Sequence, residues 1–215
     1  MNYNKHSFLE GKHALLGASK YHWMNDTEEE LIDRIAHSYA AEIGTQLHDV
    51  ARKHIQHNVK LKKYDKDSVI LDLLDRGIPR FAINCLDINT VYSNLMNYVN
   101  DCIGFRMTPE VVLAYSDLCF GTADAIGYFE KQKSLNIFDL KTGTSPAHME
   151  QLMVYVALFC LEYRVKPVDI VIECRIYQSN DIIICNPEAP DIIPIMDKIV
   201  TFDKSIRLAR GDEVK

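Results

Sequence analysis

Apolar residues recur at helical spacing through the first quarter of the chain. They stand at every fourth position, at Leu31, Ile35, Tyr39, Ile43 and Leu47. The preceding Asp26-Thr27 is a helix start signal, and three Glu follow it in the first turn. We therefore expect one helix over residues 27–56, and similar patterns predict helices over 67–76 and 89–102.

The pattern changes to strands after Pro109. Runs of apolar and β-branched residues separated by short polar turns predict three strands in an antiparallel meander, over residues 110–115, 119–129 and 135–140. Ser145 as N-cap and Pro146 as first residue predict a helix over 147–163. The remaining predicted elements are a strand pair at 168–177 and 181–185 and a helix after Pro190.

This order of elements predicts an α/β (α+β) fold with a mixed central sheet flanked by helices. A chain of 215 residues corresponds to one domain at about 150 residues per domain. Hydrophobic residues make up 47% and charged residues 25%, which excludes disordered and coiled-coil classes. The formal net charge of −6 argues against a protein that coats polyanions indiscriminately.

The sequence predicts no membrane segment. The longest unbroken apolar run, residues 152–161, is about half of the roughly 20 residues that a spanning helix needs. The first residues lack the apolar core of a secretory signal, so we expect a cytoplasmic protein. The six cysteines never stand closer than eleven positions, which predicts buried free thiols and no iron–sulfur cluster.

Two carboxylates and a lysine form the most informative pattern. Asp139 and Lys141 share one face of the third predicted strand, because strand side chains alternate. If the preceding turn spans residues 130–133, Asp124 lies directly opposite Asp139. Opposed like charges destabilise a sheet, and Mg²⁺ is commonly held by one or two carboxylates. The pattern therefore predicts a divalent cation site, the alternative being two solvated Asp and a Lys on a hairpin.

The motifs Gly-x-x-Asp, Asp-x-Lys-Thr-Gly and Gln-x-x-x-Tyr resemble those of the PD-(D/E)XK nuclease superfamily, whose core is restriction-endonuclease-like with αβββαβ order. The closest resemblance is to its RecB-like exonuclease branch, which includes phage exonucleases and CRISPR-associated nucleases. The matching residues are Gly121, Asp124, Asp139, Lys141, Gly143, Gln151 and Tyr155. The iron–sulfur subset is disfavoured, because its clustered C-terminal cysteines are missing.

The resemblance implies roles for these residues. Asp124 and Asp139 would bind Mg²⁺ or Mn²⁺, Lys141 would orient the attacking water, and Gln151 and Tyr155 would line the site. The spacing of Gln151 and Tyr155 also puts them on one helix face. The backbone carbonyl of Leu140 would complete the principal metal site.

Further candidates lie upstream. Gly44-x-x-x-His48 resembles the family's Gly-x-x-x-His helix, so His48 is a candidate ligand, with Gly44 leaving space beside it. Arg52 stands where the family often has Glu. Glu110 is either a further ligand or a solvated strand start, and Ser19 weakly matches the serine segment that begins many RecB-like domains.

A substrate backbone also needs cationic contacts. Residues 48–66 hold six Lys and Arg against two Asp, a formal charge of +4. The candidates for a phosphate track are Arg52, Lys53, Lys60, Lys62, Lys63 and Lys66, and the alternative is a solvated helix end.

Together these residues predict a metal-dependent deoxyribonuclease over residues 1–215, an exonuclease of recombination, repair, phage replication or defence. Residues 1–105 would form a mainly helical part and 106–215 the catalytic core. DNA is the expected partner, beside a second copy of the chain or a recombination or helicase protein. The alternative is a non-catalytic nuclease-fold protein that binds nucleic acid or a protein. A small-molecule metallohydrolase is disfavoured, since no HExxH-like pattern occurs.

Overall fold

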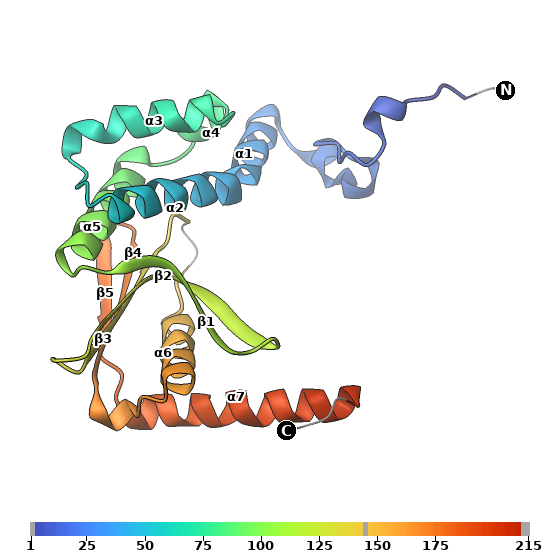
Figure 1. The fold of residues 1–215 in the computed structure, drawn as a ribbon. Coiled ribbons are helices and arrows are strands. Elements are labelled where there is room, and N and C mark those ends of the chain that lie inside the picture. Colours follow the sequence, from blue (N-terminus) through green and yellow to red (C-terminus); the bar gives the residue numbers. More distant parts are fainter. Residues whose placement is uncertain (1–2, 144–145, 212–215) are drawn as a thin grey trace.

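A five-stranded mixed sheet separates two layers of helices in the computed structural model, which describes residues 3–143 and 146–211 (Figure 1). The strand order is β1-β2-β3-β4-β5, with β3 and β4 parallel and the other neighbours antiparallel. The strands are β1 (Thr108–Ser116), β2 (Cys119–Phe129), β3 (Ser134–Leu140), β4 (Val171–Gln178) and β5 (Asp181–Cys185). The predicted α/β class and the predicted meander are confirmed.

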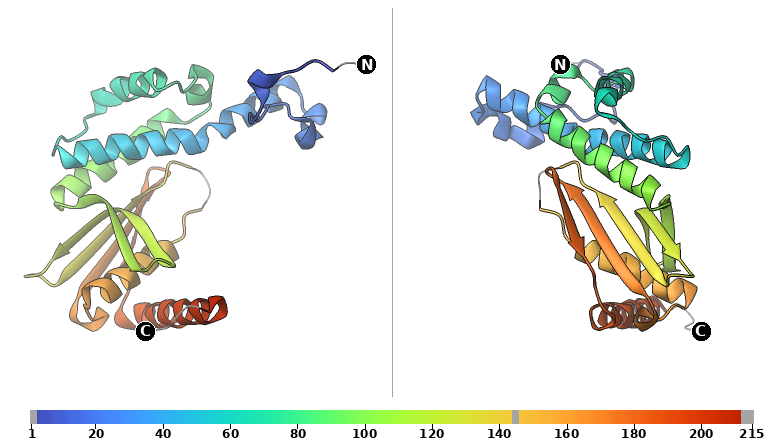
Figure 2. Two further views of the ribbon diagram at one scale, coloured as in Figure 1. Left: turned by 45° about the vertical axis from the view of Figure 1, so that its right-hand side comes forward. Right: turned by 90° about the vertical axis from the view of Figure 1, so that its left-hand side faces the viewer.

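The N-terminal helices cover one face of the sheet and the C-terminal helices the other (Figures 1 and 2). The first group is α1 (Glu28–Ser38), α2 (Ala40–Gln56), α3 (Lys66–Asp75), α4 (Arg80–Asn84) and α5 (Ile88–Gly104). The second group is α6 (Glu150–Tyr163) and α7 (Ala189–Arg210). Short 3-10 helices are η1 (Ser7–Leu9), η2 (Ala18–Asn25), η3 (Lys63–Asp65) and η4 (Pro167–Asp169).

Strand β3 is buried on both faces, so its side chains feed two apolar cores. Phe138 and Leu140 join the cluster formed with α2 and α5, whereas Ile137 joins the cluster formed with α6 and α7. This alternation follows from the two-residue repeat of a strand. A polar residue in β3 therefore has little access to water, which bears on Asp139.

The predicted single helix over residues 27–56 is wrong, because the chain breaks at Tyr39 into α1 and α2. The hydroxyl of Ser38 donates to the Ile35 carbonyl, which competes with the helical backbone pattern. The Tyr39 ring packs edge-on against Phe81 of α4, with ring centroids 6.0 Å apart. Tertiary packing thus overrides a continuous apolar period.

The start of α6 also differs from the prediction. The helix begins at Glu150 with Met149 as N-cap, so Pro146 is not its first residue, and Ser145 lies outside the described residues. Strand β4 begins at Val171 rather than at residue 168, because Pro167 starts η4. Helix α4 and the 3-10 helices, which are too short for a clear period, were not predicted.

Cysteines and hydropathy complete the comparison. All six thiols are free, but only Cys102, Cys160 and Cys174 are buried, so the expectation of buried thiols is wrong for the exposed Cys85. Over the described ranges 3–143 and 146–211, no helix combines the length and apolar character needed to cross a membrane.

Candidate metal centre

Three acidic residues occupy one row across strands β1, β2 and β3. The pairs Pro109↔Ala125 and Val111↔Ala123 bracket Glu110 and Asp124, which therefore lie across from each other. Between β2 and β3 the predicted register is confirmed from Phe129↔Ser134 to Ala125↔Phe138. The next row in this register holds Asp124 and Asp139. Like charges in adjacent positions oppose sheet formation, and a cation bound beside this row would reduce the repulsion between its carboxylates.

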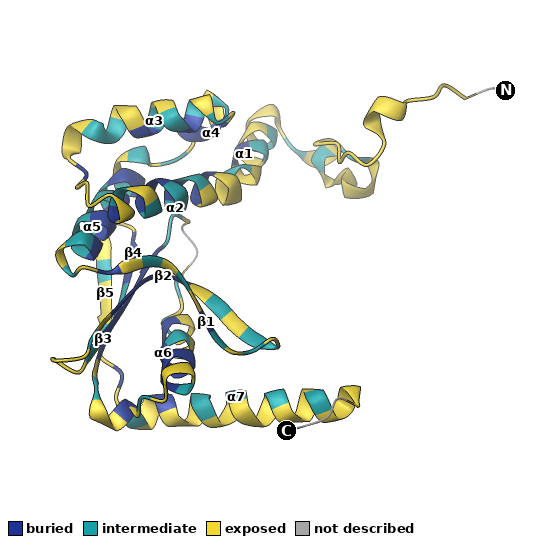
Figure 3. Cartoon of the chain, viewed as in Figure 1, coloured by how far each residue is buried: buried dark blue, intermediate teal, exposed yellow. Residues whose placement is uncertain are grey.

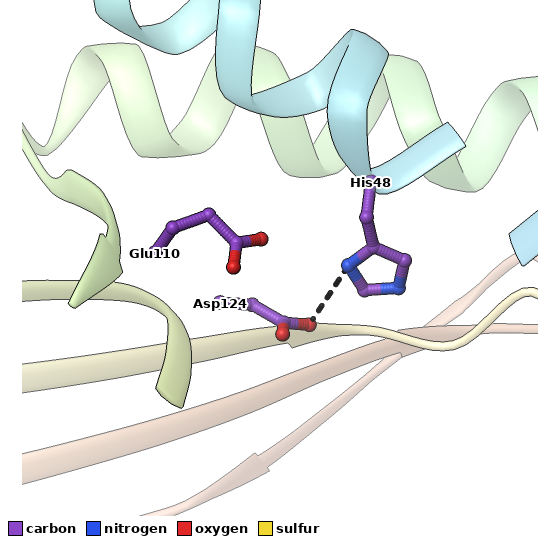
Figure 4. A group of neighbouring side chains, drawn as sticks. All are labelled: His48, Glu110 and Asp124. Atoms are coloured by element: carbon purple, nitrogen blue, oxygen red, sulfur yellow. Dashed lines mark ion pairs between the residues drawn. The ribbon is translucent and has the colours of Figure 1, made fainter. Parts of the chain in front are cut away.

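Glu110 has an unusual backbone. Its φ of 55° lies in the left-handed region, although it stands inside β1. For a residue with a β-carbon this conformation is uncommon and costs about 1–3 kcal/mol, and such outliers concentrate at functional sites. The side chain lies beside Asp124 (Figure 4). The structure therefore favours the ligand interpretation of Glu110 over the solvated strand start.

Helix α2 brings His48 to this row from the opposite side of the cleft (Figure 4). Its Nδ1 lies 3.4 Å from Oδ2 of Asp124. One donor atom from each of His48, Glu110 and Asp124 falls within 4.8 Å of the others. Imidazole nitrogen and carboxylate oxygen both bind divalent cations, so this trio is a candidate metal site.

Asp124 is electrostatically the most perturbed of the three. Burial raises its pKa to about 6, His48 opposes that rise, and Asp139 reinforces it. The backbone N–H of Leu140 donates to Oδ2 of Asp124 at 3.0 Å, which favours the ionised form. A cation beside Asp124 would offset the cost of holding its charge in this buried position.

Asp139 faces Lys141 rather than the trio. Its side chain is 4% exposed, and Lys141 Nζ lies 2.9 Å from Oδ2 and donates to Oδ1 at 3.2 Å. Oδ2 accepts no hydrogen bond of good geometry from the described part of the chain. A buried carboxylate oxygen with unused acceptor capacity is a candidate metal ligand. The predicted ligand role of the Leu140 carbonyl stays a prediction.

A polar chain links Lys141 to α6. Oε1 of Gln151 accepts a hydrogen bond from Lys141 Nζ at 3.1 Å, and Nε2 of Gln151 donates to the Tyr155 hydroxyl at 3.3 Å. The predicted pair therefore lies on one face of α6, as its spacing indicated, and Gln151 contacts Lys141. Its effect is to hold the Lys141 ammonium beside Asp139.

Two glycines allow close approach around the centre. A β-carbon on Gly44 would lie 3.0 Å from Thr142 Oγ1, so α2 packs tightly against the segment after β3. The space expected beside His48 is therefore filled by Thr142. A β-carbon on Gly121 would lie 2.9 Å from Cε1 of Tyr155. Because Gly121 has no β-carbon, the Tyr155 ring can pack directly against β2.

An open cleft of about 740 Å³ lies over the centre, between α2 and the strands. His48, Glu110 and Asp124 line it, together with Thr122 and Thr142. Sequence reasoning missed both threonines. Thr122 could have been found from strand alternation, because it stands two residues before Asp124.

The predicted phosphate contacts are dispersed. Arg52 lines the cleft, but it and Lys53 form ion pairs with Asp49, and Arg76 adds a third at 2.9 Å. These cations hold the pKa of Asp49 far below its usual range, with the Lys53 hydrogen bond contributing most. Lys60, Lys62 and Lys63 are exposed after the end of α2, and Lys66 donates to Asn89. Ser19 is exposed in η2.

The chain has no recognisable relative in the comparisons with known proteins. No family model, curated protein or solved structure matches it.

Proposed function

We propose that this chain is a divalent-metal-dependent deoxyribonuclease with a restriction-endonuclease-like core. The observation that carries the proposal is the row Glu110, Asp124 and Asp139, which His48 meets from α2 and Lys141 meets from the end of β3. Its resemblance to the RecB-like branch of PD-(D/E)XK nucleases supports an exonuclease that acts in recombination, repair, phage replication or defence.

The side chains of the row fit a Mg²⁺ or Mn²⁺ ion. Carboxylate oxygens are the preferred ligands of these hard cations, and one imidazole is compatible with Mn²⁺. Oδ2 of Asp139 is buried without a hydrogen bond from the described residues, and burial raises the pKa of Asp124, a cost that a bound cation would offset. We assign His48, Glu110 and Asp124, whose donor atoms lie together, as the side chains that would hold the ion, with Asp139 of the same row as the proposed fourth ligand.

Bound at this row, the ion would lower the pKa of water and neutralise charge on the phosphate oxygens. The protein's own contribution is orientation. Lys141 presents an ammonium group that is 30% exposed, and Asp139 and Gln151 fix its direction. A fixed ammonium can hydrogen-bond to a water or to a phosphate oxygen. Tyr155 supports Gln151 and is a positioning residue.

The deciding experiment compares linear and circular DNA with Mg²⁺, Mn²⁺ or EDTA. We expect degradation of linear DNA, none of closed circles, and no activity in EDTA. Asp124→Asn should abolish cleavage, and Lys141→Ala should lower the rate by about 10²–10⁴-fold, the range of a positioned proton-handling group.

Lys131→Ala is the matched control, since Lys131 is exposed in the β2–β3 turn, and it should cleave like the wild type. Cleavage by Lys141→Ala at the wild-type rate would overturn the mechanism. Inertness of the wild type with every metal and substrate would favour a non-catalytic protein of this fold.

A further inference from the structure

Residues 3–25 form an N-terminal arm that projects from α1 and lies outside both helical layers (Figures 1 and 2). None of its residues is buried, although they form two 3-10 helices, η1 and η2 (Figure 3). Such a segment buries too little apolar surface to be stabilised by the rest of the chain. Its side chains are therefore accessible from solution.

The charge of the arm is opposite to that of the chain. Three lysines, Lys5, Lys12 and Lys20, stand against Glu10, which gives a net charge of +2 in a chain of −6. Three of the eight histidines, at positions 6, 13 and 22, add to this charge when protonated. The positive arm thus attracts an anionic ligand more strongly than the rest of the chain, whose net charge is negative.

Exposed aromatic rings alternate with these cations. Tyr3, Phe8 and Tyr21 are 87%, 68% and 55% exposed. The Tyr21 ring stacks on His22 with centroids 4.5 Å apart. Trp23 donates from Nε1 to the Gly17 carbonyl at 3.2 Å, which ties η2 to its preceding turn. Flat rings beside lysines are the combination on which unpaired bases stack while their phosphates are neutralised.

A protein partner is the alternative occupant, because the arm also exposes Leu15 and Met24. Against it, lysine is depleted in protein interfaces, and docking helices present an apolar stripe that η2 lacks. We infer that the N-terminal arm binds single-stranded nucleic acid, through stacking on Tyr21 and its neighbours and through the three lysines. This inference rests on the proposed function in one respect, namely that the bound nucleic acid leads to the proposed nuclease centre.

The position of the arm suits that role. Helix α1 joins the arm to Ala40 of α2, which lines the cleft, over a helix about 16 Å long. A strand held on the arm can therefore continue into the cleft. The arm would select substrates with an unpaired end over fully paired duplex, whose bases stack on one another.

Trp23 is the only tryptophan of the chain, so intrinsic fluorescence reports on the arm directly. The test titrates the full chain in EDTA with oligothymidylate of about 16 nucleotides, at the upper end of a single-strand site. We expect quenching of Trp23 emission, and about fivefold or greater loss of affinity for Tyr21→Ala. Tyr163→Ala, an exposed tyrosine at the end of α6, is the control and should bind normally.

Salt dependence gives a second readout. Lys5→Gln, Lys12→Gln and Lys20→Gln together should flatten the slope of log affinity against log salt by up to about 2. Trp23 emission that oligothymidylate does not quench would overturn the inference, and so would wild-type affinity of Tyr21→Ala. Trp23 emission that changes with protein concentration in the absence of oligonucleotide would also overturn it, because a second copy of the chain would then occupy the arm. Binding without cleavage refutes the proposed nuclease alone, and cleavage without quenching refutes the arm alone.

Discussion

Glu110 and Asp139 show how one row of a sheet can give two carboxylates different surroundings. Glu110 is exposed in β1 and reaches the cleft through its left-handed backbone. Asp139 lies on a strand buried on both faces and forms an ion pair with Lys141. The proposed centre thus joins an accessible ligand to a buried one, with Asp124 between them.

Gly121 and Tyr155 give a residue-scale prediction. Gly121→Ala places a β-carbon 2.9 Å from Cε1 of the Tyr155 ring, so the ring must move. We expect a net loss of about 1–2 kcal/mol, since overpacking outweighs the smaller gain from a stiffer unfolded chain. Urea unfolding measures the loss. Cleavage should also slow, because Tyr155 supports Gln151.

Gly104→Ala is the matched control, because its added β-carbon would have no described atom within 4 Å beyond its chain neighbours and the backbone of its own helix, and it should not destabilise. In a double-mutant cycle, Tyr155→Ala should remove most of the penalty of Gly121→Ala. Additive losses would mean that the ring is not the group that Gly121 accommodates.

At the residue scale, the sequence predicted those contacts that depend on strand and helix periods. The opposition of Asp124 and Asp139 follows from the turn length, and the pairing of Gln151 with Tyr155 follows from helical spacing. The direction of the Glu110 side chain, which points towards His48, could not be predicted. It depends on a left-handed φ that nothing in the local sequence requires. The ion pair of Arg52 with Asp49 could not be predicted either, because it belongs to a cluster that includes Arg76 of a distant segment.

At the element scale, strands were predicted more closely than helix ends. Strands β2 and β5 have the predicted bounds, since polar turns end them sharply. The break at Tyr39 coincides with packing against Phe81 of α4, which periodicity does not report. Short elements such as α4 contain too few residues to show a period.

The N-cap of α5 supplies an element-scale prediction. Oδ1 of Asp87 accepts the N–H of Thr90, and the Thr90 hydroxyl donates to Oδ2 at 2.6 Å. These bonds lower the pKa of Asp87, the hydroxyl bond most. Because the folded pKa lies below the unfolded one, the stabilisation is complete above about pH 4 and is lost as pH falls through the folded pKa.

The test compares urea midpoints of the wild type and Asp87→Asn, which keeps a capping oxygen without the charge. The wild type should be the more stable protein at about pH 7, and the difference should shrink as the pH falls below about 4. In a Thr90→Ala background the difference should shrink, because the strongest contact is gone. A difference that does not change with pH would contradict this account.

At the scale of the whole molecule, the proposed centre joins the two halves of the chain. His48 comes from the N-terminal helical part, and the acidic row comes from the sheet. Helix α2 crosses above the strands (Figure 1), and the cleft is lined by residues of α2 together with Glu110 and Asp124. An ion held there would link α2 to β1 and β2, so its binding should be measurable as stability of the entire fold.

Thermal unfolding tests this link without any nuclease assay. An ion that binds only the folded state adds about 2.7 kcal/mol at one hundred times its dissociation constant. For a chain of this size that corresponds to a rise in Tm of about 5–10 °C. We expect this rise with Mn²⁺ and its reversal by EDTA. Asp124→Asn should remove most of it, whereas Asp169→Asn, an exposed change of the same charge in η4, should keep it. Equal Mn²⁺ shifts in both variants would place the ion elsewhere, and no shift in the wild type would refute the centre.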